Sequence, residues 1–183
     1  VSLLKELTAL LDTLNCPIDY TDYKAKQRLL AGYFEKTKSI SGIKVEVSLE
    51  DLISDLEAKY HHLFDWLARK EWLKVGFFSG YYDNKALRAE GKFGNKIRIF
   101  LPSQVFAIMS GVASDEQVRQ TWEAIKKYLR DKKLGGFHLN TDLEKPYLEL
   151  GRAFGFSYGD KENGAFFSHM NVMLANALYK RGF

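Results

Sequence analysis

The most regular stretch of the chain is residues 48–72, which read SLEDLISDLEAKYHHLFDWLARKEW. A serine at position 48 followed by an acidic residue at position 51 is typical of a capped helix start. Apolar side chains then recur at spacings of three and four, which predicts an amphipathic α-helix running to about Trp72. The apolar positions are Leu49, Leu52, Ile53, Leu56, Tyr60, Leu63, Phe64 and Leu67.

Helical patterns also occur on both sides of this stretch. Apolar spacing predicts helices over residues 3–14 and 25–34, the second ended by residues 39–42, and a short helix over about 103–110. A second capping box, residues 114–117, predicts a helix through Leu129 that Gly135 and Gly136 close. The chain therefore contains several helices of ordinary length.

Two segments lack the helical pattern. From Gly76 to Leu101, glycines, paired aromatics and the short β-like run at residues 96–100 predict irregular structure or a hairpin. A long loop is expected from Gly135 to Asn163, before a largely buried final helix that starts near Gly164. We expect an all-α fold with a minor irregular or β-hairpin region. Periodicity alone leaves a helical array and an α/α barrel both open.

Composition places the chain among globular proteins. It has 183 residues, 46% of them hydrophobic, a length that suits one domain rather than two. No membrane span or signal peptide is expected, and Cys16, the only cysteine, fits a reducing cytoplasm. The net charge of +4 is scattered along the chain, so we expect no nucleic-acid partner and no membrane partner.

Several catalytic motifs are absent from the sequence. There is no phosphate loop ending in Lys-Ser/Thr, no nucleophile elbow and no zinc-binding histidine pair. His61 and His62 are adjacent within the long helix, where a structural or surface role is expected. His138 lies in a loop, where it could meet a ligand or bond to the backbone. We therefore expect neither a metal nor a cofactor.

The stretch most suggestive of function is residues 158–169, YGDKENGAFFSH. Charged and amide groups lead into a predicted helix N-terminus, where free N–H groups and the helix dipole favour an anion such as phosphate. With Asn163 as the cap, Ser168 and His169 would lie one to two turns inside that helix. A buried histidine behind a cap is also an ordinary structural arrangement, so both interpretations stay open.

Residues 161–169, KENGAFFSH, resemble a motif of the cellobiose phosphorylase family, glycoside hydrolase family 94. The likeness continues in order through residues 80–84, 103–111, 134–142 and 151–154, and its wording is closest to the β-1,2-oligoglucan phosphorylases of that family. It implies an (α/α)6 barrel of which residues 1–183 are a single segment. Such an enzyme cleaves a β-glucoside, β-1,2-oligoglucan or cellobiose-like, with inorganic phosphate as co-substrate and inversion to an α-sugar 1-phosphate.

The resemblance also assigns binding residues. His169 and Ser168 would bind phosphate. A second group would bind the sugar: Lys161, Glu162, Asn163, Gln104, Tyr81 and Arg152. Because phosphate replaces the base-activated water of an inverting hydrolase, the reaction needs only one carboxylic acid.

That acid is missing from the residues at hand. The family's general-acid aspartate lies in a Trp-Asn-Asp-like segment that no part of residues 1–183 reproduces. Asp12 is superficially similar to that aspartate, but its surroundings predict an amphipathic surface helix, so we do not assign it the role. The chain is therefore expected to be a fragment that needs the remainder of its barrel, and a homodimer is possible. The alternatives are a transglycosylating or hydrolytic relative and a non-catalytic helical module that binds carbohydrate or protein.

Overall fold

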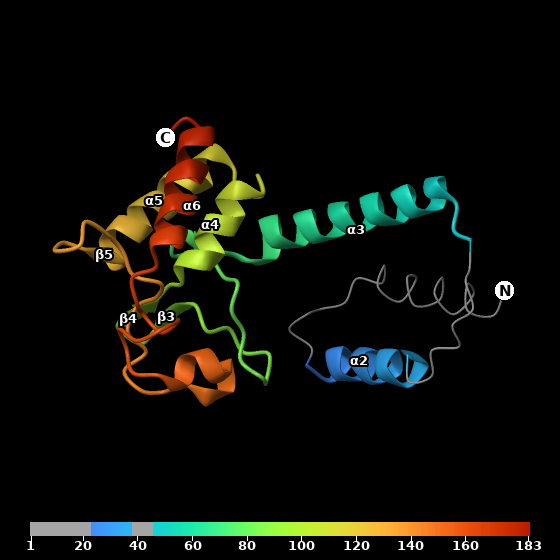
Figure 1. Ribbon diagram of the computed structural model, residues 1–183, viewed down its shortest axis with the longest axis horizontal. Coiled ribbons are helices and arrows are strands. Elements are labelled where there is room, and N and C mark those ends of the chain that lie inside the picture. Colours follow the sequence, from blue (N-terminus) through green and yellow to red (C-terminus); the bar gives the residue numbers. More distant parts are fainter. Residues whose placement is uncertain (1–22, 38–45) are drawn as a thin grey trace. The chain divides into compact units, whose positions relative to one another are not determined.

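The computed structural model describes residues 23–37 and 46–183 (Figure 1). Contacts divide the chain into two compact units, Val1–Asp65 and Trp66–Phe183. The helices within the described residues are α2 (Tyr23–Thr37), α3 (Leu49–Lys70), α4 (Leu101–Met109), α5 (Asp115–Tyr128) and α6 (Ser168–Lys180). Helices predominate, with short antiparallel strand pairs, as the sequence predicted. The expected helix over residues 3–14, with Asp12, and Cys16 lie outside the described residues.

Helix α3 confirms the expectation for residues 48–72. Ser48 Oγ accepts a 3.0 Å hydrogen bond from the Asp51 N–H, which is the predicted cap. None of the helix residues is buried, and the apolar face is open: Leu49 is 72% exposed and Leu56 56%. Amphipathic helices draw most of their stability from packing this face. The apolar face of α3 is therefore suited to a further packing partner.

In the second unit, α4 packs against both α5 and α6 (Figure 1). The predicted capping box of α5 is present, since Ser114 Oγ accepts from the Gln117 N–H and Gln117 Oε1 accepts from the Ser114 N–H. Fully buried side chains fill the space between these helices. They include Leu101, Val105, Ile108, Val118, Ile125 and Leu174.

Three antiparallel hairpins and two 3-10 turns complete this unit. The hairpins pair β1 (Trp72–Leu73) with β2 (Phe77–Phe78), β3 (Gly91–Phe93) with β4 (Lys96–Arg98), and β5 (Arg130–Asp131) with β6 (Gly136–Phe137). The turns are η1 (Leu148–Leu150) and η2 (Arg152–Gly155). The hairpin predicted between residues 76 and 101 is confirmed.

Three local expectations were wrong. Helix α5 ends at Tyr128, and Gly135, with φ of 75°, turns the β5–β6 hairpin instead of ending the helix. Helix α6 begins at Ser168 rather than near Gly164, because Gly164 has φ of 76° and Asn163 is bonded elsewhere. It is also buried on one side only, since Val172 is 67% exposed and Tyr179 82%.

None of the helices formed by residues 23–37 and 46–183 is long and apolar enough to cross a membrane.

Candidate functional site

A pocket of about 220 Å³ brings together predicted site residues from three separate parts of the chain. Tyr81 comes from the segment after β2, Glu162 from the loop before α6, and His169 from the first turn of α6. Phe100, Asn140 and Phe154 also line the pocket. It is therefore a polar-edged hollow beside a helix N-terminus.

Helix α6 starts at this pocket without a side-chain cap. Phe167 occupies the N-cap position and makes no side-chain hydrogen bond to the helix, and the Asn171 N–H bonds to Phe167 O. Ser168 and His169 are exposed in the first turn. Because α6 begins at Ser168, both residues lie at the helix end where free N–H groups and the helix dipole attract an anion.

The loop from Tyr158 to Gly164 is fixed by its buried end. Asn163 is 3% exposed, accepts a 3.0 Å hydrogen bond from Asn140 Nδ2 and donates a 2.7 Å bond to Phe156 O. Lys161 has φ of 47°, and its Nζ lies 4.4 Å from the centroid of the Phe156 ring. Both polar atoms of the Asn163 side chain are thus used inside the fold, while Lys161 and Glu162 are exposed.

Tyr81 is held in the pocket wall by aromatic contacts. Its ring stacks on Phe100 with centroids 4.5 Å apart, and the edge-to-face partner Phe154 lies 5.7 Å away. Burial, and secondarily the negative charge of Glu90, raises the pKa of the Tyr81 hydroxyl, which therefore stays neutral and able to donate a hydrogen bond.

Glu90 is a buried carboxylate that sequence reasoning did not single out. Its Oε2 accepts from the N–H groups of Gly80 and Tyr81 at 2.5 and 3.2 Å and from Ser103 Oγ at 2.7 Å. Its Oε1 accepts from the Phe100 N–H at 2.9 Å and from Gln104 Nε2 at 3.2 Å. Burial raises the pKa of Glu90 to about 7, against the lowering effect of its hydrogen bonds. A single glutamate before a glycine gives no sequence signal for such a role.

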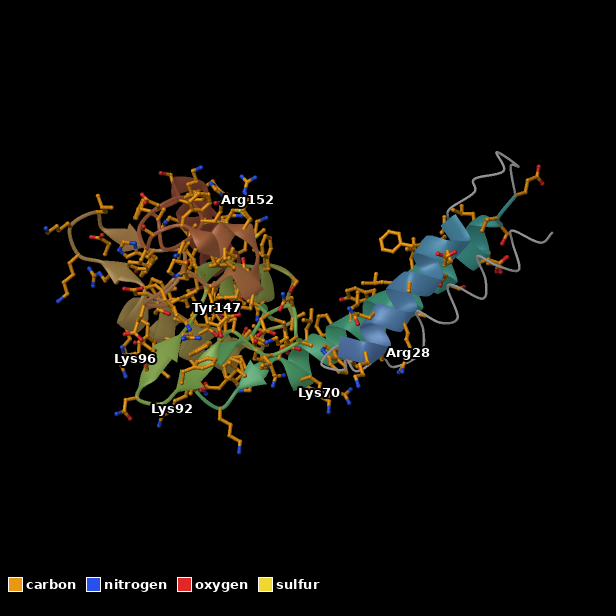
Figure 2. The ribbon with its side chains drawn as sticks, turned by 90° about the horizontal axis from the view of Figure 1, so that it is seen from below. Arg28, Lys70, Lys92, Lys96, Tyr147 and Arg152 are labelled. Carbon is orange, nitrogen blue, oxygen red and sulfur yellow. The ribbon has the colours of Figure 1, made fainter. Side chains whose placement is uncertain are left out.

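Four of the six predicted sugar residues do not line the pocket, and two of these, Gln104 and Arg152, also lie outside the loop before α6. Gln104 is fully buried, and its Oε1 accepts a 2.9 Å hydrogen bond from the Phe78 N–H. Its Nε2 donates to Phe78 O at 2.8 Å and also bonds to Glu90 Oε1 and Phe100 O. Arg152 is exposed in η2 and lies at the outer edge of its unit (Figure 2). The roles assigned to both residues remain predictions from sequence.

A larger and mainly apolar hollow of about 630 Å³ shares Tyr81 and Pro102 with this pocket. Glu71 lies in its wall and is 4% exposed. It accepts hydrogen bonds from Trp66 Nε1 at 3.1 Å and from the Tyr82 hydroxyl at 2.6 Å. Arg88 completes the network through a 2.9 Å bond from its Nε to the Tyr82 hydroxyl. These partners account for the burial of Glu71.

No group of three or more His, Cys, Asp or Glu side chains within the part of the chain that the structure describes could hold a metal ion. His61 is exposed and His62 is half-buried on α3.

Two comparisons with known proteins bear on this arrangement. A family model described as "Glycosyl hydrolase 94 superfamily, catalytic domain" matches residues 34–182. The chain is also similar to N,N'-diacetylchitobiose phosphorylase of Vibrio proteolyticus, with 35% identity over 94 residues. The match covers 46% of this chain but 12% of that relative, so the chain spans only a small part of the relative's length.

Proposed function

The chain belongs to the glycosyl hydrolase 94 superfamily, and from this premise we propose that it forms part of the catalytic domain of an inverting glycoside phosphorylase. The fold class predicted from the sequence, all-α with a minor β-hairpin region and part of an (α/α)6 barrel, is confirmed. The similar Vibrio proteolyticus protein is named as a phosphorylase of N,N'-diacetylchitobiose, which supports phosphorolysis as the reaction.

The observation that carries the proposal is the meeting of Glu162 and His169 at one pocket, beside the uncapped start of α6. Phosphate would be bound by His169 and Ser168 together with free N–H groups of the first helical turn. Glu162 and Tyr81 would bind hydroxyl groups of the sugar, because carboxylate oxygens accept and phenolic hydroxyls donate hydrogen bonds. Anion and sugar would then share one pocket.

The other predicted sugar residues would act around Glu162 and His169. Lys161 is exposed on the same loop as Glu162 and would reach the sugar from the rim. Asn163 and Gln104 would act by shaping the loop and the wall, since their amides are bonded within the protein. Arg152 would reach a more distant part of the sugar from the protein surface. No cofactor is needed for this chemistry.

In the proposed reaction, phosphate attacks the anomeric carbon while a carboxylic acid protonates the leaving oxygen. The products are an α-sugar 1-phosphate and a shortened acceptor. The acid is not among the residues identified in this chain, so it would come from another part of the gene product. We propose a β-linked gluco-oligosaccharide as substrate, β-1,2-linked or cellobiose-like, on the likeness of residues 161–169.

The exposed apolar surfaces support the proposal that residues 1–183 are one segment of a larger barrel. On α3, Leu52 is 45% exposed and Leu63 46%, and on α4 Phe106 is 55% exposed. Stable monomers rarely leave apolar patches of this kind uncovered. Packing by the remainder of the barrel would cover them, which disfavours the alternative of a stand-alone binding module.

The decisive experiment uses the intact gene product. Its mass is measured first, and release of sugar 1-phosphate is then followed with cellobiose and short β-1,2-glucans, with and without phosphate. We expect phosphate-dependent release of the α-anomer, read by NMR. Sugar release without phosphate would instead indicate a hydrolytic relative. A gene product of this length with no activity would favour the binding module.

A further inference from the structure

The imidazole ring of His138 bridges two segments that lie far apart in the sequence. Its Nδ1 lies 2.7 Å from the carbonyl oxygen of Gly164, in the loop before α6. Its Nε2 lies 3.1 Å from Oδ2 of Asp131, on strand β5. The ring is partly buried, with 26% of its side chain exposed. Both nitrogens are therefore engaged with protein oxygens.

The chemistry of these two oxygens decides which form of the ring can donate to both of them. A backbone carbonyl can only accept a hydrogen bond, and so can an ionised carboxylate. Asp131 is ionised, because the N–H groups of Leu134 and Lys133 hold the pKa of its carboxyl below the usual range. A neutral imidazole carries one N–H and could serve only one of these acceptors. Both contacts are satisfied together only by the imidazolium form.

The Gly164 end of the bridge lies at the proposed site. Gly164 directly follows Glu162 and Asn163, and Glu162 lines the pocket together with His169. The neighbouring backbone is bonded to the same segment, since the Leu139 N–H donates to Ala165 O at 3.1 Å. Displacing the Gly164 carbonyl would therefore move the loop that presents Glu162.

We propose that His138 is a positioning residue for sugar binding, whose doubly protonated ring ties Gly164 to Asp131 and so holds Glu162 at the pocket. This inference rests on the proposed function for its catalytic consequence. Its structural part, the bridge itself, stands on the two contacts alone. His138 does not line the pocket and is not assigned a contact with substrate.

Other titratable groups surround the ring. The Tyr158 ring lies 5.9 Å from the His138 ring. The negative charges of Asp142 and Asp131 interact with the hydroxyl group of Tyr158. Burial, followed by these two carboxylates, raises the pKa of Tyr158, which therefore stays neutral. The negative charge next to His138 thus comes from Asp131, with Asp142 nearby.

The phosphate end of the pocket is anchored separately. Asn171 of α6 accepts a 2.8 Å hydrogen bond from the Phe137 N–H and donates a 3.1 Å bond to Phe137 O. Loss of the His138 bridge should therefore loosen the loop around Glu162 more than the first turn of α6. This difference separates a positioning role from general destabilisation.

The first test measures the bridge in the intact protein. Nitrogen-15 NMR of the ring at about pH 6 should show protons on both nitrogens, and Asp131→Asn should remove that signature. Hydrogen exchange of residues 158–164 should become about tenfold faster in His138→Gln, the effect of losing one hydrogen bond to a charged group. Lys132→Gln, which removes an exposed charge from the same hairpin, is the matched control and should leave exchange unchanged. A neutral ring or unchanged exchange overturns the proposal.

The second test measures the consequence for the reaction. We expect His138→Gln and Asp131→Asn each to raise the KM for the gluco-oligosaccharide about tenfold, with the KM for phosphate changed less than about twofold. The double variant should be no worse than either single variant, because both break the same bridge. Faster exchange with an unchanged sugar KM would overturn the positioning role. If the wild-type protein lacks phosphorolysis, the proposed function fails, and the exchange and NMR results still decide the bridge.

Discussion

Nδ2 of Asn140 donates a 3.0 Å hydrogen bond to Oδ1 of Asn163, and both side chains are buried. Oδ1 of Asn140 in turn accepts a 2.7 Å bond from the Gly164 N–H. The pair therefore connects the segment after β6 to the loop that carries Glu162. Each amide has its partners inside the protein, as buried polar groups require.

Asn140→Ala should lower the free energy of unfolding by roughly 1–3 kcal/mol, because it leaves the Gly164 N–H and Asn163 Oδ1 buried without their partner. Chemical denaturation measures the change. Asn95→Ala, in the exposed turn between β3 and β4, is the control and should change stability by less than about 0.5 kcal/mol. Equal effects of the two variants would contradict the role of the pair.

Gly164→Ala should destabilise the chain more than Gly94→Ala. Both glycines have positive φ, 76° and 59°, so both substitutions carry backbone strain of about 1–2 kcal/mol. At Gly164 a Cβ would also lie 2.1 Å from Cε2 of Tyr158, whereas at Gly94 nothing lies within 4 Å. Thermal unfolding compares the variants. Adding Tyr158→Ala should restore part of the stability lost in Gly164→Ala. If no stability is restored, the steric explanation is wrong.

Glu90 predicts a dependence of stability on pH. Burial raises the pKa of Glu90 from 4.5 to about 7. Between these values the folded state binds a proton that the unfolded state releases, so the free energy of unfolding should fall as pH rises from 4.5 to about 7. The full effect is about 3 kcal/mol. Glu90→Gln should remove this slope, whereas Glu149→Gln, an exposed control, should keep it. Parallel curves for Glu90→Gln and wild type would mean that five hydrogen bonds keep the carboxylate ionised.

His169→Ala should impair phosphorolysis more than folding. We expect the KM for phosphate to rise about tenfold or more, since a hydrogen bond to a charged group is lost, while the sugar KM changes little. Initial rates at varied phosphate give the value, and the melting temperature should stay within a few degrees because His169 is exposed. Val172→Ala, also exposed on α6, is the control. An unchanged KM for phosphate would contradict the role of His169 in phosphate binding.

Leu56→Ala and Leu63→Ala test whether a larger barrel covers the apolar face of α3. Both side chains are exposed in this chain, so truncation alone should cost little here. In the intact gene product each should cost about 2–5 kcal/mol if packing partners cover the face. Glu57→Ala, an exposed neighbour, is the control in both settings. Small effects in the intact protein would argue against burial of this face.

The sequence predicted those elements whose signals are local. The α5 start followed from a serine and a glutamine three residues apart, which satisfy each other's backbone groups without help from elsewhere. The hairpin at residues 91–98 agrees with the glycines and the short β-like run at residues 96–100 that predicted a hairpin in this region. The likeness of residues 161–169 to a known motif singled out Glu162 and His169, which line the same pocket, while their binding roles stay predictions.

The start of α6 could not be predicted in the same way. Asn163 is a favourable cap by residue type, but its amide is bonded to Asn140 and to Phe156 O. Those partners lie 23 and 7 residues away, so no local pattern reveals them. The hydrogen-bond network of Glu90 was missed for the same reason, because its donors come from residues 80–81 and 100–104, two segments that meet Glu90 only in the folded chain.

The contacts that join residues 138–140 to residues 163–165 affect the entropy cost of binding a ligand. Lys161 is held at φ of 47°, a conformation that a free chain seldom adopts. Its neighbours are fixed by Asn140 and by the Leu139 N–H bond to Ala165 O. The entropy of ordering this loop is therefore lost during folding rather than at each encounter with a sugar, so the loop meets its ligand preorganised.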